Sequence, residues 1–123
     1  MADIHVIFPK GKEAIVKNDG EFMFSGERVT WCFYTDDPEV QQVEIEFEGN
    51  EKACFFPGGS YGPYSYKKGV SKGRAEIYGY VPDYPGENAP VIAKYTVRGL
   101  GSDGTPVDEM LTVVDPVIIT PKP

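Results

Sequence analysis

The segment VQQVEIEFEG (residues 40–49) carries the clearest structural signal in the chain. Its apolar residues Val43, Ile45 and Phe47 alternate with glutamates. Side chains of a β-strand point in turn to its two faces, so this period of two predicts a strand with one buried and one wet face. The preceding run ERVTWCFY (residues 27–34) shows the same alternation and predicts a second strand of this kind.

The rest of the chain continues this pattern, and no segment shows a sustained helical period. The 14 glycines and 11 prolines separate short apolar runs at the spacing typical of an all-β sandwich or barrel. We expect a kink at Asp115-Pro116, because proline cannot donate to a ladder. The sequence predicts a single domain over residues 1–123, a two-layer antiparallel β-sandwich of about eight strands. The remaining expected strands are residues 4–8, 13–17, 52–56, 73–81, 91–99 and 110–120.

Composition and charge narrow the classes of partner. The formal net charge is −7, which argues against a nucleic-acid partner, because that affinity rests on neutralising phosphates with Lys and Arg. The chain has no apolar run long enough to span a bilayer and no signal-peptide pattern, so we expect no membrane partner and a cytoplasmic location. In a reducing cytosol Cys32 and Cys54 are expected to be free thiols, although a bridge between them stays open.

The order GERVTWCF, VEIEF, KYTVRG and an apolar closing strand resembles a cupredoxin-like or immunoglobulin-like sandwich. The resemblance implies a fold and no activity. Where immunoglobulin domains have a late Tyr-x-Cys, Tyr95 is followed by Thr96 and Val97. A blue-copper site needs two imidazoles and a thiolate, but the chain has one histidine, His5. We therefore expect the copper ligands to be missing, and no metal or other cofactor to be bound.

No motif for catalysis is evident. The sequence offers no nucleophile motif or positioned partner for His5, so we interpret it as an ordinary strand residue. Three glutamates on one strand face favour solubility and edge protection, although paired carboxylates could also cleave a glycoside. The acidic turns at residues 36–39 and 103–108 leave weak calcium binding open. We expect the chain not to be an enzyme. The three glutamates are Glu44, Glu46 and Glu48.

The stretch FFPGGSYGPYSY (residues 55–66) consists of aromatic residues, glycine, proline and two serines. Together with GYVPDYPG (residues 79–86) it supplies tyrosines, which give contact area at low entropic cost and a hydroxyl for hydrogen bonds. The alternative is that these rings fold back over the sandwich end as a lid on the core. The predicted partner-binding aromatic residues are Phe56, Tyr61, Tyr64, Tyr66, Tyr80 and Tyr84.

The segment YKKGVSKGR (residues 66–74) holds four of the chain's 12 Lys and Arg residues. Such a basic segment could bind an acidic face of another copy, or could be a solvated hairpin loop. We include Lys67, Lys68, Lys72 and Arg74 in the predicted binding surface. The leading hypothesis is a non-enzymatic interaction or structural protein that binds itself or a protein partner. The alternative is a carbohydrate-binding module that uses the loop tyrosines as stacking platforms.

Overall fold

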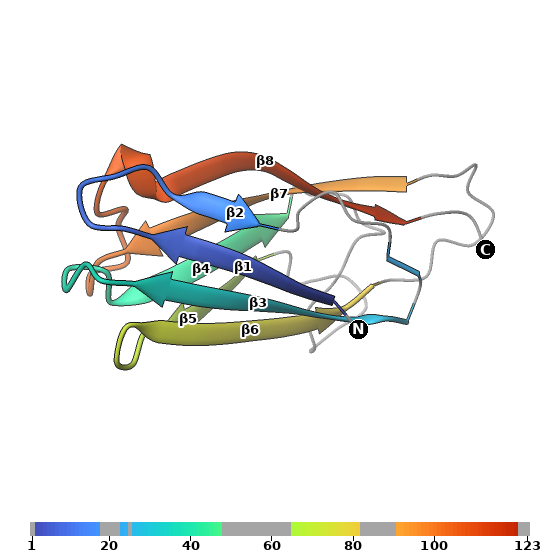
Figure 1. The fold of residues 1–123 in the computed structure, drawn as a ribbon, viewed down its shortest axis with the longest axis horizontal. Coiled ribbons are helices and arrows are strands. Elements are labelled where there is room, and N and C mark those ends of the chain that lie inside the picture. Colours follow the sequence, from blue (N-terminus) through green and yellow to red (C-terminus); the bar gives the residue numbers. More distant parts are fainter. Residues whose placement is uncertain (1, 18–22, 25, 48–64, 82–90, 121–123) are drawn as a thin grey trace.

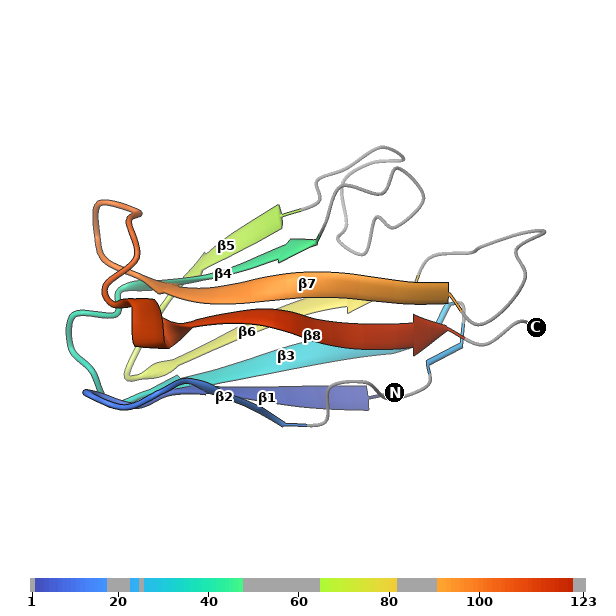
Figure 2. The ribbon, with the colours of Figure 1, turned by 90° about the horizontal axis from the view of Figure 1, so that it is seen from above.

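The computed structural model describes residues 2–17, 23–24, 26–47, 65–81 and 91–120. In these residues it is an all-β sandwich, with eight strands in two layers (Figures 1 and 2). The strands are β1 (Ala2–Phe8), β2 (Ile15–Lys17), β3 (Arg28–Thr35), β4 (Gln42–Phe47), β5 (Ser65–Gly69), β6 (Arg74–Tyr80), β7 (Val91–Leu100) and β8 (Thr112–Thr120), with a single 3₁₀ turn, η1 (Glu109–Leu111), before β8.

The first sheet has the strand order β2-β1-β3-β6, and the second has the order β5-β4-β7-β8. Five of the six ladders are antiparallel, as predicted, but β1 pairs with β3 in parallel. The two strands run in the same direction because the chain crosses from β1 through the short β2 before it returns as β3. Figure 2 shows the two layers with their strands along a common long axis.

The predicted alternation places the core between the two sheets. Trp31 from β3 packs against Phe47 and Tyr95 from the second sheet, with ring centroids 6.0 and 5.8 Å apart. All three side chains are buried. Aromatic pairs in this edge-on geometry stabilise a core beyond the burial of their area. Their contact across the two layers confirms the inward faces that the sequence predicted for β3 and β4, and Tyr95 adds β7 to the same core.

One strand assignment differs from the sequence-based expectation. Residues 65–69 form β5, although they were expected to be part of a loop. All five residues are exposed, so no hydrophobic period marks the strand. β5 is a strand because it pairs with β4, and Lys67 lies opposite Glu44 in that ladder. The strand predicted at residues 52–56 lies outside the described residues.

The kink predicted at Asp115-Pro116 is present as a β-bulge. The register between β7 and β8 shifts between Lys94 and Thr96, which pair with Val117 and Val114. Two β8 residues therefore face one residue of β7 at this point. A bulge absorbs the missing N–H of the proline without ending the strand.

The loops at residues 9–14, 36–41, 70–73 and 101–108 gather at one end of the sandwich, on the left in Figures 1 and 2. Hydrogen bonds tie these loops to the strands. The Thr35 hydroxyl donates to the Phe8 carbonyl at 2.8 Å, and the Lys10 amide donates to Asp36 Oδ1 at 2.7 Å. These contacts fix the start of the connection from β3 to β4 against the end of β1.

Candidate functional site

The structure brings the described members of the predicted binding set onto two strands that follow each other in the chain. Tyr66, Lys67 and Lys68 lie on β5, whereas Arg74 and Tyr80 lie on β6. Lys72 is in the tight turn between these strands. The other predicted residues lie outside the described part of the chain, and they are Phe56, Tyr61, Tyr64 and Tyr84.

The turn from β5 to β6 determines where β6 begins. Ser71 and Arg74 exchange two backbone hydrogen bonds, of 2.9 and 3.1 Å. The two residues between them, Lys72 and Gly73, have φ angles of 54° and 73°. Two left-handed residues in succession are typical of a type I′ hairpin turn. A turn of the hairpin type is therefore present in the basic segment, but the strands that it joins, β5 and β6, belong to different sheets.

Two tyrosines on the outer face of β6 form an exposed aromatic pair. The exposed fraction is 44% for Tyr78 and 46% for Tyr80, and their ring centroids lie 6.2 Å apart in an edge-on arrangement. The Arg28 guanidinium lies over the Tyr78 ring, 4.5 Å from its centroid. Stacking on arginine holds the ring in place and presents a surface that is both aromatic and charged.

A small cleft lies beside this pair, between β5 and β6. It has a volume of about 160 Å³ and is lined by Tyr66, Lys68, Glu76, Ile77 and Tyr78. Tyr66 and Lys68 are in register with the buried residues of β4, so they lie on the inner side of the second sheet at its edge. Pockets for drug-sized ligands usually measure about 300–1,000 Å³, so this cleft suits one side chain of a partner better than a whole ligand. We call Arg28, Tyr66, Tyr78 and Tyr80 the tyrosine surface.

Sequence reasoning missed two members of the tyrosine surface. Tyr78 could have been found, because the period of two in residues 73–81 places it on the same wet face as Tyr80. Arg28 could not, because its contact with Tyr78 depends on the pairing of β3 with β6. No local signal in the sequence specifies that pairing.

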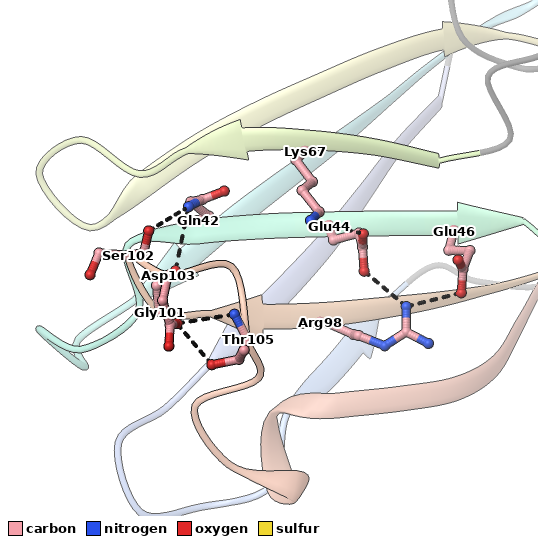
Figure 3. A network of polar contacts seen from close by, with 9 residues as sticks. All are labelled: Gln42, Glu44, Glu46, Lys67, Arg98, Gly101, Ser102, Asp103 and Thr105. Carbon is pink, nitrogen blue, oxygen red and sulfur yellow. Dashed lines mark hydrogen bonds and ion pairs between the residues drawn. The ribbon is translucent and has the colours of Figure 1, made fainter.

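Charged side chains on the outer face of the second sheet form ion pairs with one another (Figure 3). Arg98 Nη1 lies 2.9 Å from Glu44 Oε1 and 3.1 Å from Glu46 Oε1, and Lys67 Nζ lies 3.9 Å from Glu44 Oε2. Burial acts to lower the pKa of Arg98, but hydrogen bonds to the two glutamates outweigh it and raise that pKa. Of the glutamates predicted on the wet face, Glu46 is exposed, whereas the side chain of Glu44 is only 13% exposed. Glu48 lies outside the described residues.

In the two acidic turns, carboxylate oxygens accept hydrogen bonds from groups of the same turn. Asp37 Oδ1 accepts from the Glu39 amide at 3.0 Å, and Asp103 Oδ1 accepts from the amide and the hydroxyl of Thr105 at 3.1 and 2.8 Å. The bonds from Thr105 lower the pKa of Asp103. Open hollows of about 480 and 630 Å³ lie beside these turns (lining residues include Asp37 and Asp103, respectively). Across the described residues, no three His, Cys, Asp or Glu side chains are arranged to hold a metal ion.

His5 and Cys32 lie in register on the outer face of the first sheet. The His5 ring stacks on Tyr34, with centroids 5.9 Å apart, and Cys32 is a free thiol. Burial raises the pKa of the Cys32 thiol, and the negative charges of Asp3 and Glu76 raise it further. A nucleophilic cysteine needs the opposite shift, so this environment favours an unreactive thiol. Cys54 lies outside the described residues.

Comparison of the chain with models of protein families, with curated proteins and with solved structures finds no match. The candidate site therefore rests on the geometry of the chain alone. Within residues 2–17, 23–24, 26–47, 65–81 and 91–120, no helix has the length and apolar character to cross a bilayer.

Proposed function

We propose that the chain is a non-enzymatic interaction or structural protein that binds itself or a protein partner through the tyrosine surface. The observation that carries the proposal is the exposed pair Tyr78 and Tyr80, with Arg28 stacked on one ring, beside a cleft the size of a side chain. Tyrosine and arginine are enriched at protein interfaces, because each combines a large contact area with directed hydrogen bonds.

The geometry favours a protein partner over the carbohydrate alternative. A sugar stacks on an open aromatic face, but the Arg28 guanidinium covers one face of Tyr78. The rings of Tyr78 and Tyr80 stand at 87° to each other, so they do not form one flat platform. The proposal keeps the cytoplasm as the compartment, for which a free thiol at Cys32 is typical.

Site-specific photo-crosslinking in cells that express the full chain would test this function. A photoreactive phenylalanine analogue replaces Tyr80 in one variant, and Val114 in a matched control. Val114 is 62% exposed and lies on β8, in the other sheet. We expect discrete protein adducts from the Tyr80 position and none from Val114, with a lower yield when Tyr78→Ser is added. Absence of adducts at Tyr80, or an equal yield at both positions, would contradict the proposal.

A further inference from the structure

Four strands lie at the sheet edges in the described part of the chain, and three of them carry features that hinder pairing with another chain. Natural edges are protected by short length, lysines, prolines or bulges. β2 has only three residues. β5 has five residues, including Lys67 and Lys68. β8 contains Pro116 at its bulge.

Among the described residues, β6 has none of these four features, although its exposed residues include the charged Arg74 and Glu76. It is seven residues long, contains no proline, and pairs with β3 from Arg74 to Tyr80 without a register shift. Its exposed side chains include Tyr78 and Tyr80 of the tyrosine surface. A long and regular edge strand is a template for the addition of another strand. Among the described strands, only β3 pairs with β6.

Hydrogen bonds at the ends of β6 show which of its backbone groups face outward. The Gly73 carbonyl accepts from the Thr35 amide at 2.9 Å, and Val81 bonds the backbone of Gly26 and Glu27, so odd-numbered residues point towards β3. Successive residues of a strand point their N–H and C=O groups to opposite sides. The backbone groups of even-numbered residues therefore point away from β3. Arg74 bonds to Ser71, which leaves Glu76, Tyr78 and Tyr80 along the open edge.

We propose that a second copy of this chain adds to this edge, with its β6 antiparallel to the first and Tyr78 of the two copies facing each other. The inference rests on the proposed function and names the partner of the same surface. The first sheets of the two copies would join into one continuous sheet of eight strands. The pairing occupies both β6 edges, so it closes as a two-fold dimer and does not propagate.

The sequence of β6 is self-complementary in this register. Tyr78 faces its own copy, Glu76 faces Tyr80, and on the inner side Ile77 faces Gly79, which has no side chain to obstruct it. No two like charges are opposed. A register centred on Glu76 would place two carboxylates opposite each other, which is unfavourable. Arg28 is in register with Tyr80, so the Glu76 of the second copy would approach a positive charge.

The cleft beside β6 fits the same arrangement. It is lined on one side by Tyr66 and Lys68 of β5 and on the other by residues of β6. A strand added at the β6 edge would lie across its opening. Its inward side chain, Ile77 of the second copy, would be covered by the apolar part of this wall. The backbone edge of β6 and the opening of the cleft would then be covered together.

Sedimentation equilibrium of the full chain tests the proposal, with charge substitutions at the two-fold axis. We expect the native chain to approach twice its mass of 13.6 kDa with rising concentration. Tyr78→Lys and Tyr78→Glu each oppose like charges, and we expect each to raise the dissociation constant by about tenfold or more. An equimolar mixture of the two variants should restore the dimer, because lysine then faces glutamate. The same two substitutions at the exposed Val114 are the matched control and should change nothing.

A proline at the same position tests the backbone contribution. Tyr78→Pro removes an N–H that points outward, so it should spare the pairing with β3 but abolish the dimer. Fluorescence of the buried Trp31 confirms that each variant is folded. A dimer that survives Tyr78→Pro would overturn the proposal, as would a mixture that fails to restore it. A tighter Tyr78→Lys dimer would also overturn it, because that result places Tyr78 opposite Glu76.

A native chain that stays monomeric at about millimolar concentration, far above an ordinary dissociation constant, would likewise overturn this inference. It would leave the proposed function standing if Tyr80 still crosslinks to a different protein in cells. The two failures are therefore distinguishable.

Discussion

Substitution of Gly73 by alanine tests whether the tight turn before β6 is as constrained as its geometry indicates. Gly73 has a φ of +73°, and a Cβ atom built on it would lie 2.6 Å from the Thr35 carbonyl oxygen. The left-handed conformation alone costs a residue with a side chain about 1–2 kcal/mol. Relief of the clash must move backbone, because the Gly73 carbonyl also accepts from the Thr35 amide at 2.9 Å. Weakening that bond adds about 1 kcal/mol or more.

We therefore expect Gly73→Ala to lower the free energy of unfolding by about 2–4 kcal/mol. Two other glycines serve as controls that separate the conformational cost from the cost of the steric clash. Gly11 has a φ of +69° with nothing within 4 Å of its added Cβ, so Gly11→Ala measures the conformational cost alone. Gly69 has neither constraint, and Gly69→Ala should be neutral or stabilise by about 0.5 kcal/mol by restricting the unfolded chain.

Urea denaturation followed by the fluorescence of Trp31, the single tryptophan, gives these three values. The difference between Gly73→Ala and Gly11→Ala isolates the steric contact with Thr35. A difference below about 0.5 kcal/mol, comparable to a neutral surface substitution, would refute the reasoning. The turn would then adjust freely, and the start of β6 would not be fixed by its contact with β3.

Two further predictions concern charged and titrating groups. Arg98→Gln leaves Glu44 and Glu46 without their shared cation, so we expect a loss of about 1 kcal/mol in urea denaturation that shrinks at about 1 M salt. The control Lys94→Gln, exposed on the same strand, should have little effect, and equal losses would contradict this assignment. In a Cys54→Ser background, the pH midpoint for alkylation of Cys32 should lie above that of the same thiol in the urea-unfolded chain, since burial and nearby carboxylates raise its pKa. Its contribution to stability should be complete below the pKa of the unfolded thiol and decline as pH rises through the folded pKa, because the unfolded chain loses that proton first; a folded midpoint at or below the unfolded one would contradict this.

The strands that could be predicted from the sequence are those that bury one face. Val43, Ile45 and Phe47 alternate with charged residues, and the structure buries all three. β5 could not be recognised in this way, because its stability comes from its pairing with β4 and from the charge pair of Lys67 with Glu44. The parallel pairing of β1 with β3 was also missed. A period of two tells which face of a strand is buried and does not tell which strand lies beside it.

In the candidate site, too, some features could be predicted from the sequence and others could not. Tyr66 and Tyr80 were selected from their composition and position in the chain, and the structure places both on neighbouring strands at one edge of the sandwich. The cleft between β5 and β6 and the contact of Arg28 with Tyr78 depend on how separate segments meet. These features follow from packing between segments distant in sequence, which local patterns do not encode.

The placement of charge separates two ways in which copies of this chain could associate. Of the basic segment and the acidic face, Lys67 and Glu44 already lie beside each other within one copy, and Glu44 also pairs with Arg98. An interface built from these groups must first disrupt contacts within each copy, and its strength would fall steeply with salt. The β6 edge requires no such rearrangement. Backbone hydrogen bonds and the burial of tyrosine and isoleucine would form that contact, and salt screens neither to a large extent. The β6 edge is therefore a better basis for self-association than the basic segment.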